Sequence, residues 1–199
     1  MMLENNSIKE NRRKLLYSLL GELPPPSRKI TAKKLSSIKK ENYILEELLL
    51  DLNGIEEVPA YFIKPQLESG KKFPVVLYNH SHGGNYVLGK DELIKGNVYL
   101  AKPSYAQALA ENGYAGLCID CWAFGKRNSR TESEIFKYML WNGQVMWGMM
   151  VYDSIKAIDY LYSREDIDSS RIATIGISMG STMAWWLAAL DTRIKVCID

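Results

Sequence analysis

The chain has 199 residues, of which 47% are hydrophobic and 24% charged, the balance of a soluble globular protein with a sizeable core. Its formal net charge of +2 is too small to indicate a nucleic acid or an acidic membrane surface as a partner. The sequence contains no run of about 20 apolar residues and no secretory cleavage pattern. We therefore expect a cytoplasmic protein that binds neither nucleic acid nor membrane.

The first 40 residues predict a helical segment that packs on the main domain. Capping-box spacing begins at Ser7, and Gly21 with the prolines at 24–26 ends the helix. One helical face collects the apolar residues Ile8, Leu15, Leu16 and Leu19. We place a helical cap or entry segment at 1–40 and the main domain at 41–199.

The following segments alternate between strands and helices. Residues 43–52 and 58–63 predict a hairpin with its turn at Asn53-Gly54. Gly143 and Gly148 are expected to break or bend a long helical stretch. The further predicted elements are a strand at 73–78, a helix at 103–112, a strand at 115–119, the helical stretch at 131–164, a turn at 168–170, a strand at 171–177, a helix at 178–190 and a strand at 194–198.

This order predicts an α/β fold with a mainly parallel sheet and helices on both faces. In such a sheet the carboxyl ends of the parallel strands meet at one edge, where functional loops gather. The polar residues His80, Asp120, Ser178 and Asp199 all follow predicted strands. An active site is therefore expected at that edge, with Asp120 holding the turn that follows it.

Ser178 is the central residue of a G-x-S-x-G pentapeptide at 176–180. The pentapeptide joins an apolar strand to an apolar helix, and its glycines avoid clashes in a tight strand-to-helix turn that presents a nucleophilic serine. The alternative, a turn serine between two glycines, does not explain why a buried strand runs directly into a buried helix. We predict Ser178 as a nucleophile and the backbone N–H of Met179 as an oxyanion donor.

The loop after the first central strand has the sequence His-Ser-His-Gly-Gly at 80–84. Its position predicts the second oxyanion donor, with the N–H of His82 as first choice and that of Gly83 as second. The chain has only two histidines, and both lie in this loop. A base here would reach the serine from the oxyanion side, so we expect His80 to stabilise the loop through hydrogen bonds and His82 to contribute its backbone.

Two further groups of residues have weaker patterns. Trp122 and Phe124, at the start of a lid-like stretch at about 124–145, are candidates for an apolar acyl pocket, although ordinary core packing explains them equally well. Cys118 and Cys121 form an isolated C-x-x-C in an apolar context. We expect these cysteines to pack in the core and predict no metal site.

Four segments together resemble the α/β-hydrolase superfamily, and in particular dienelactone-hydrolase-like and acetyl-xylan-esterase-like bacterial hydrolases: 78–84, 120–125, 166–171 and 176–181. The resemblance implies an eight-stranded sheet, a Ser-Asp-His triad in that chain order, and hydrolysis of small-molecule esters or related acyl compounds without a cofactor. It also implies Ser178 as nucleophile with Met179 and His82 as oxyanion donors. Ser81 stands where the family usually has glycine, which is expected to restrict the loop backbone.

The resemblance places the triad acid and histidine after later strands, beyond residue 199. We therefore expect the N-terminal part of a longer hydrolase, with an incomplete sheet and little activity of its own. Asp199 is a weak candidate for the acid, since the chain offers no histidine for it to orient. Two alternatives remain: a non-catalytic binding module of this fold, and a prolyl-oligopeptidase-type peptidase, against which the lack of propeller-like repeats counts.

Overall fold

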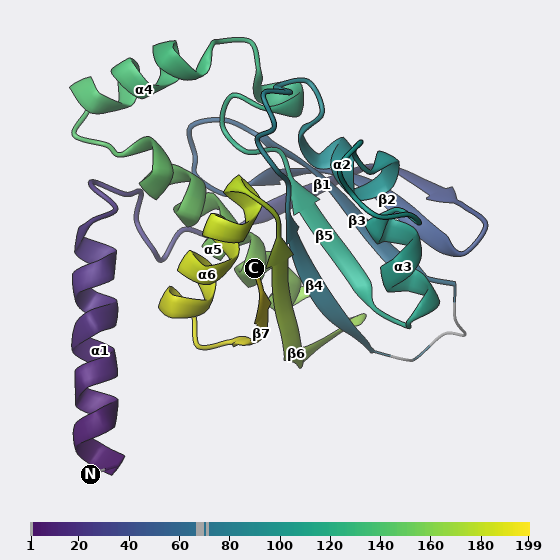
Figure 1. Ribbon diagram of the computed structural model, residues 1–199, viewed down its shortest axis with the longest axis horizontal. Coiled ribbons are helices and arrows are strands. Elements are labelled where there is room, and N and C mark those ends of the chain that lie inside the picture. Colours follow the sequence, from purple (N-terminus) through teal and green to yellow (C-terminus); the bar gives the residue numbers. More distant parts are fainter. Residues whose placement is uncertain (1, 67–69, 71) are drawn as a thin grey trace.

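The computed structural model describes residues 2–66, 70 and 72–199, in which strands and helices alternate (Figure 1). The strands are β1 (Thr31–Lys39), β2 (Tyr43–Asp51), β3 (Val58–Pro65), β4 (Phe73–Asn79), β5 (Ala115–Ile119), β6 (Ile167–Gly176) and β7 (Ile194–Ile198). The α-helices are α1 (Met2–Ser18), α2 (Glu92–Lys95), α3 (Tyr105–Glu111), α4 (Glu132–Trp141), α5 (Met146–Ser163) and α6 (Met179–Leu190). Short 3₁₀ turns lie at η1 (Gly89–Asp91) and η2 (Gly125–Arg127).

The strands form one sheet in the order β1-β2-β3-β5-β4-β6-β7. Strands β5, β4, β6 and β7 run parallel, whereas β1, β2, β3 and β5 pair antiparallel. Among the described residues, three of the six pairings are therefore parallel, and the sheet is mixed instead of mainly parallel as expected. The parallel half still brings the carboxyl ends of β4, β5 and β6 to one edge.

Helices cover both faces of the sheet, as predicted (Figure 1). Side chains alternate along β4: Val75 and Leu77 join the core beneath α5 and α6, while Tyr78 joins a second core with Leu93 of α2 and Ala106 of α3. Helix α4 projects from the body beyond α5 (Figure 1). Within the described part of the chain, no helix combines the length and hydropathy required to cross a bilayer.

The N-terminal segment differs from the expected helical cap. Helix α1 lies against α6, where Arg13 Nε donates to the carbonyl of Ala189 at 3.1 Å. Of the predicted apolar face, only Leu16 packs against the core. Its other members, Ile8, Leu15 and Leu19, are exposed.

Residues 31–39 form a strand that was not predicted. Strand β1 pairs antiparallel with β2 from Thr31 opposite Asp51 to Lys39 opposite Ile44, with a bulge between Lys34 and Ser36. Its side chains are almost all exposed, so its sequence carries no apolar alternation to indicate a strand. This segment therefore belongs to the main sheet and corrects the expected helical segment at 1–40.

The predicted hairpin of β2 and β3 is confirmed, but its connection is longer than a two-residue turn. Leu50 pairs with Val58, so residues 52–57 form the loop. The buried side chain of Asn53 accepts the N–H groups of Ile55 and Glu56 and donates to Asp153 at 2.7 Å. Asn53 thus anchors the loop to α5 instead of occupying an exposed hairpin turn.

The helical stretch at 131–164 is broken once. Gly143, with φ +69°, lies between α4 and α5, as predicted. Gly148 lies inside an unbroken α5, where a Cβ atom would overlap the carbonyl group of Leu20. The residues 168–170, expected as a turn, belong to β6, whose pairing with β4 shifts register there.

Replacing Gly148 with alanine should lower the free energy of unfolding by about 1–3 kcal/mol, because the added methyl group must displace the Leu20 carbonyl. In an exposed helix the same change stabilises by up to about 1 kcal/mol. Urea denaturation of the two proteins measures the difference. An unchanged or increased stability would contradict the close approach of the N-terminal segment to α5.

Candidate active site

Ser178 occupies the junction between β6 and α6. Its backbone has φ 57° and ψ −121°, and it is one of two described non-glycine residues with positive φ, the other being Ala123. Such a conformation is strained for an L-residue and is the one adopted by serine on a sharp strand-to-helix turn. Ser178 is exposed, and its Oγ makes no hydrogen bond to a described residue. The predicted elbow is therefore present in the backbone.

The two glycines of the pentapeptide are required by close backbone contacts. A Cβ atom on Gly176 would overlap the carbonyl of Gly180, and one on Gly180 would overlap the carbonyl of Asn79 at the end of β4. The Asn79 amide donates to Thr174 Oγ1 at 2.8 Å and to the Ile175 carbonyl at 3.1 Å. The end of β4 is therefore held directly against the elbow.

His80 orients the loop that follows β4. The N–H of Cys121 donates to its Nε2 at 3.1 Å, so the ring proton resides on Nδ1, which donates to the Ser81 carbonyl at 2.9 Å. That carbonyl shares a peptide plane with the N–H of His82, and the two point in opposite directions. The expected loop-stabilising role of His80 is confirmed, and it determines the direction of the His82 N–H.

Glu92, at the start of α2, holds the same loop from the other side. Its buried carboxylate accepts the Ser81 N–H at 2.8 Å, the Ser81 hydroxyl, and the Tyr78 hydroxyl at 2.8 Å. Burial by itself would raise the pKa of this carboxyl, but hydrogen bonds, including one from Asn97, outweigh burial and lower it. Sequence reasoning missed Glu92, because no motif marks an acidic residue 11 positions after the loop serine.

The predicted oxyanion donors have free N–H groups. Those of Met179, His82 and Gly83 make no hydrogen bond to any residue that the structure describes. Gly83 has φ +52°, and a Cβ atom there would approach the Tyr99 hydroxyl. The assignment of His82 and Met179 as the donor pair stays a prediction, with Gly83 as the alternative.

The hydrogen bonds of the His82 side chain do not place it as the base for Ser178. Its Nδ1 accepts the Gly84 N–H at 3.0 Å, so the proton is on Nε2, which lies 3.4 Å from Glu132 Oε2 and 3.2 Å from the Tyr86 hydroxyl. In the described part of the chain, no hydrogen bond joins either histidine ring to Ser178. Both rings are therefore engaged in holding loops.

Asp120 has the structural role expected of it. Its carboxylate accepts the Lys126 N–H of the following turn at 3.0 Å, and also the N–H and Nζ of Lys90 at 2.7 and 3.0 Å.

Cys118 and Cys121 are free thiols buried in the core, which confirms the expected packing. Burial raises the pKa of Cys121 to about 12.

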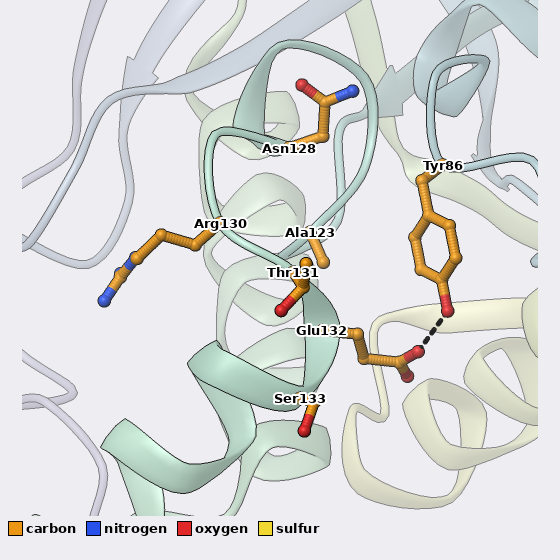
Figure 2. A pocket seen from close by; sticks show the side chains of 7 residues that line it. All are labelled: Tyr86, Ala123, Asn128, Arg130, Thr131, Glu132 and Ser133. Carbon is orange, nitrogen blue, oxygen red and sulfur yellow. Dashed lines mark hydrogen bonds between the residues drawn. The ribbon is translucent and has the colours of Figure 1, made fainter.

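Trp122 and Phe124 are buried in the core, so their predicted place in an acyl pocket stays a prediction. Trp122 is buried beneath the Arg127 guanidinium, 4.2 Å from the ring centroid. The Phe124 ring packs against the loop that follows β4, with its centroid 5.0 Å from that of His80, 5.2 Å from His82 and 4.9 Å from Tyr86. A cavity of about 370 Å³ lies nearby, lined by Tyr86, Ala123, Asn128, Arg130, Thr131, Glu132 and Ser133 (Figure 2).

The buried position of His80 predicts a pH dependence of stability. Burial lowers the pKa of this ring, so the unfolded chain binds the proton more readily than the folded chain. The stability from the neutral ring is complete above pH about 6.5 and is lost as the pH falls below it, by up to about 1.4 kcal/mol per pH unit. Urea denaturation between pH 7.5 and 5 should show this slope.

The variant His80→Gln should be less stable at pH 7.5 and should lose most of the slope, because it has no group to titrate in this range. A matched His82→Gln variant keeps His80 and should keep the slope. Equal slopes in His80→Gln and the unaltered protein would show that another group is responsible.

The sequence and fold of the chain are similar to those of known hydrolases. The model of the dienelactone hydrolase family matches residues 92–198, more than half of the chain. The Bacillus subtilis (strain 168) protein named "Putative hydrolase YtaP" is 55% identical over 192 residues, which are 96% of this chain and 64% of that protein. The chain thus spans just under two thirds of this curated relative.

Solved esterase structures share the fold. A "putative acetyl xylan esterase" from Bacteroides fragilis matches 95% of this chain and 51% of its own with a TM-score of 0.77 at 19% identity. The acetyl xylan esterase from Paenibacillus sp. R4 matches 93% of this chain and 55% of its own with a TM-score of 0.64 at 21% identity. At these identities the similarity is one of fold.

Proposed function

The chain belongs to the dienelactone hydrolase family, and on this premise we propose that it carries the nucleophile and oxyanion hole of a serine esterase acting on carboxyl esters or related acyl compounds. The observation that carries the proposal is the elbow: Ser178 is exposed at positive φ between β6 and α6, and both flanking glycines lack room for a side chain. A serine in ordinary loop structure has no need of this strained arrangement.

In the proposed reaction the Ser178 hydroxyl attacks the ester carbonyl carbon, and a general base takes its proton. The negative charge that develops on the carbonyl oxygen is stabilised by the N–H groups of Met179 and His82 at the start of α6 and in the loop after β4. Each such donor contributes on the order of 3 kcal/mol to transition-state stabilisation. The alcohol leaves with the proton, and water then hydrolyses the acyl-serine.

The base and its carboxylate partner are proposed to come from a part of a longer protein that follows residue 199. The two histidines of the chain support this division, because His80 bridges Ser81 and Cys121 while His82 contacts Gly84 and Glu132. The length of the relative also supports it, since 36% of the Bacillus protein lies outside the match. The 199-residue chain would then supply the nucleophile without its activation.

A fluorophosphonate probe, which phosphonylates activated serines, tests the proposal. The 199-residue chain should label slowly, and only at Ser178, whereas a longer protein that includes the following residues should label on the order of 10³-fold faster or more. Ser178→Ala should abolish labelling in both. Intact-protein mass spectrometry measures the rate and the site.

Two results would contradict the proposal. Rapid labelling of the short chain that disappears in Ser178→Ala would show that the base lies within these residues. A longer protein that labels no faster than the short chain would favour a non-catalytic member of the fold.

A further inference from the structure

The cavity beside the oxyanion loop contains one carboxylate that is aimed into it. In Figure 2 the side chains of Tyr86 and Glu132 point toward each other, joined by a hydrogen bond, whereas Arg130 extends away. The Arg130 guanidinium lies 5.2 Å from the Tyr138 ring centroid. Of the two charged residues that line the cavity, Glu132 directs its carboxylate toward Tyr86, whereas Arg130 directs its guanidinium away.

Glu132 is held in place through one of its two carboxylate oxygens. The Tyr86 hydroxyl donates to Oε2, and His82 Nε2 lies 3.4 Å from the same atom. The bond to Glu132 raises the pKa of the Tyr86 hydroxyl, which therefore stays a donor at neutral pH. Among the described residues, Oε1 has no hydrogen-bond partner, and no lysine or arginine lies within ion-pair distance of the carboxylate.

Other lining groups also have hydrogen-bonding capacity to spare. Asn128 and Ser133 are among the residues that line the cavity, and neither side chain makes a hydrogen bond to a described residue. Tyr86 and Ala123 contribute apolar surface to the same wall. Pockets of this kind bind through apolar contact and take their specificity from a few polar groups.

The cavity adjoins the site of the proposed chemistry through His82. The side chain of His82 contacts Tyr86 and Glu132 in the cavity wall, and its backbone N–H is the proposed oxyanion donor. The loop that carries His82 follows Asn79, whose carbonyl abuts Gly180 of the elbow. A substrate bound at Ser178 therefore has this cavity next to the oxyanion side of its ester group.

We propose that Glu132 makes this cavity a subsite that favours uncharged, hydroxyl-bearing ester groups over esters that carry a carboxylate. The inference rests on the proposed function. The free Oε1 accepts a hydrogen bond from a substrate hydroxyl, while Asn128 and Ser133 bond further hydroxyl or carbonyl groups. An anionic substrate group meets the uncompensated charge of Glu132, and this repulsion weakens its binding.

Equilibrium binding in a Ser178→Ala background tests the subsite without requiring catalysis. The probes are glycerol monobutyrate, ethyl butyrate and monoethyl succinate, titrated into the 199-residue chain and followed by two-dimensional NMR. The glycerol ester should bind most tightly and monoethyl succinate most weakly. Adding Glu132→Gln should improve binding of monoethyl succinate about three- to fivefold relative to ethyl butyrate, because the repulsion is removed while an acceptor for Tyr86 remains.

Glu134→Gln is the matched control. Glu134 lies in the same helical turn, carries the same charge, and completes the Thr131 capping box, which glutamine also serves. Unlike Glu132, it does not line the cavity. The affinity ratio of the esters should not change in this variant.

The proposal is overturned if Glu132→Gln leaves the ester ratios unchanged, if Glu134→Gln produces the same gain, or if none of the esters binds. NMR spectra of each variant show whether the fold is retained. A change in the affinity ratio can then be distinguished from unfolding of the variant. A failed fluorophosphonate reaction combined with the expected ester ratios would refute the proposed esterase chemistry and leave the subsite standing.

Discussion

The contact between the first turn of α6 and the last residue of β4 controls the geometry of the whole site. Gly180 meets the carbonyl of Asn79 without space for a methyl group, and Gly176 meets Gly180 in the same way. Because backbone packs on backbone here, the position of Ser178 relative to the β4 loop has little freedom. The strained dihedral angles of Ser178 are maintained by this packing and not by the serine side chain.

The orientation of the loop, in contrast, depends on groups from distant parts of the chain. The His80 ring bonds both the Cys121 N–H, after β5, and the Ser81 carbonyl. Glu92 of α2 accepts hydrogen bonds from the Ser81 N–H and hydroxyl. The serine that departs from the family's glycine is thus accommodated by a carboxylate partner. His80 and Glu92 thus hold two adjacent peptide groups, those on either side of Ser81. Their hydrogen bonds set the direction of the His82 N–H.

The elements that could be predicted from sequence are those in which burial shapes the residue pattern. Strands β4 and β5 are apolar and buried and were located correctly, as were helix α6 and the serine elbow between its glycines. Strand β7 was also located, although it is only partly buried. Strand β1 is exposed and lysine-rich, so its pairing with β2 left no pattern to detect. Glu92 and Glu132 act through contacts across the fold, to residues 11 and 50 positions away, which no local spacing encodes.

The bulge in β1 has a consequence for how copies of this chain can meet. Strand β1 forms one edge of the sheet, and its bulge together with Lys33, Lys34 and Lys39 makes that edge a poor template for another strand. Strand addition at the β1 edge would therefore have to overcome both the bulge and the repulsion between the lysines of two chains.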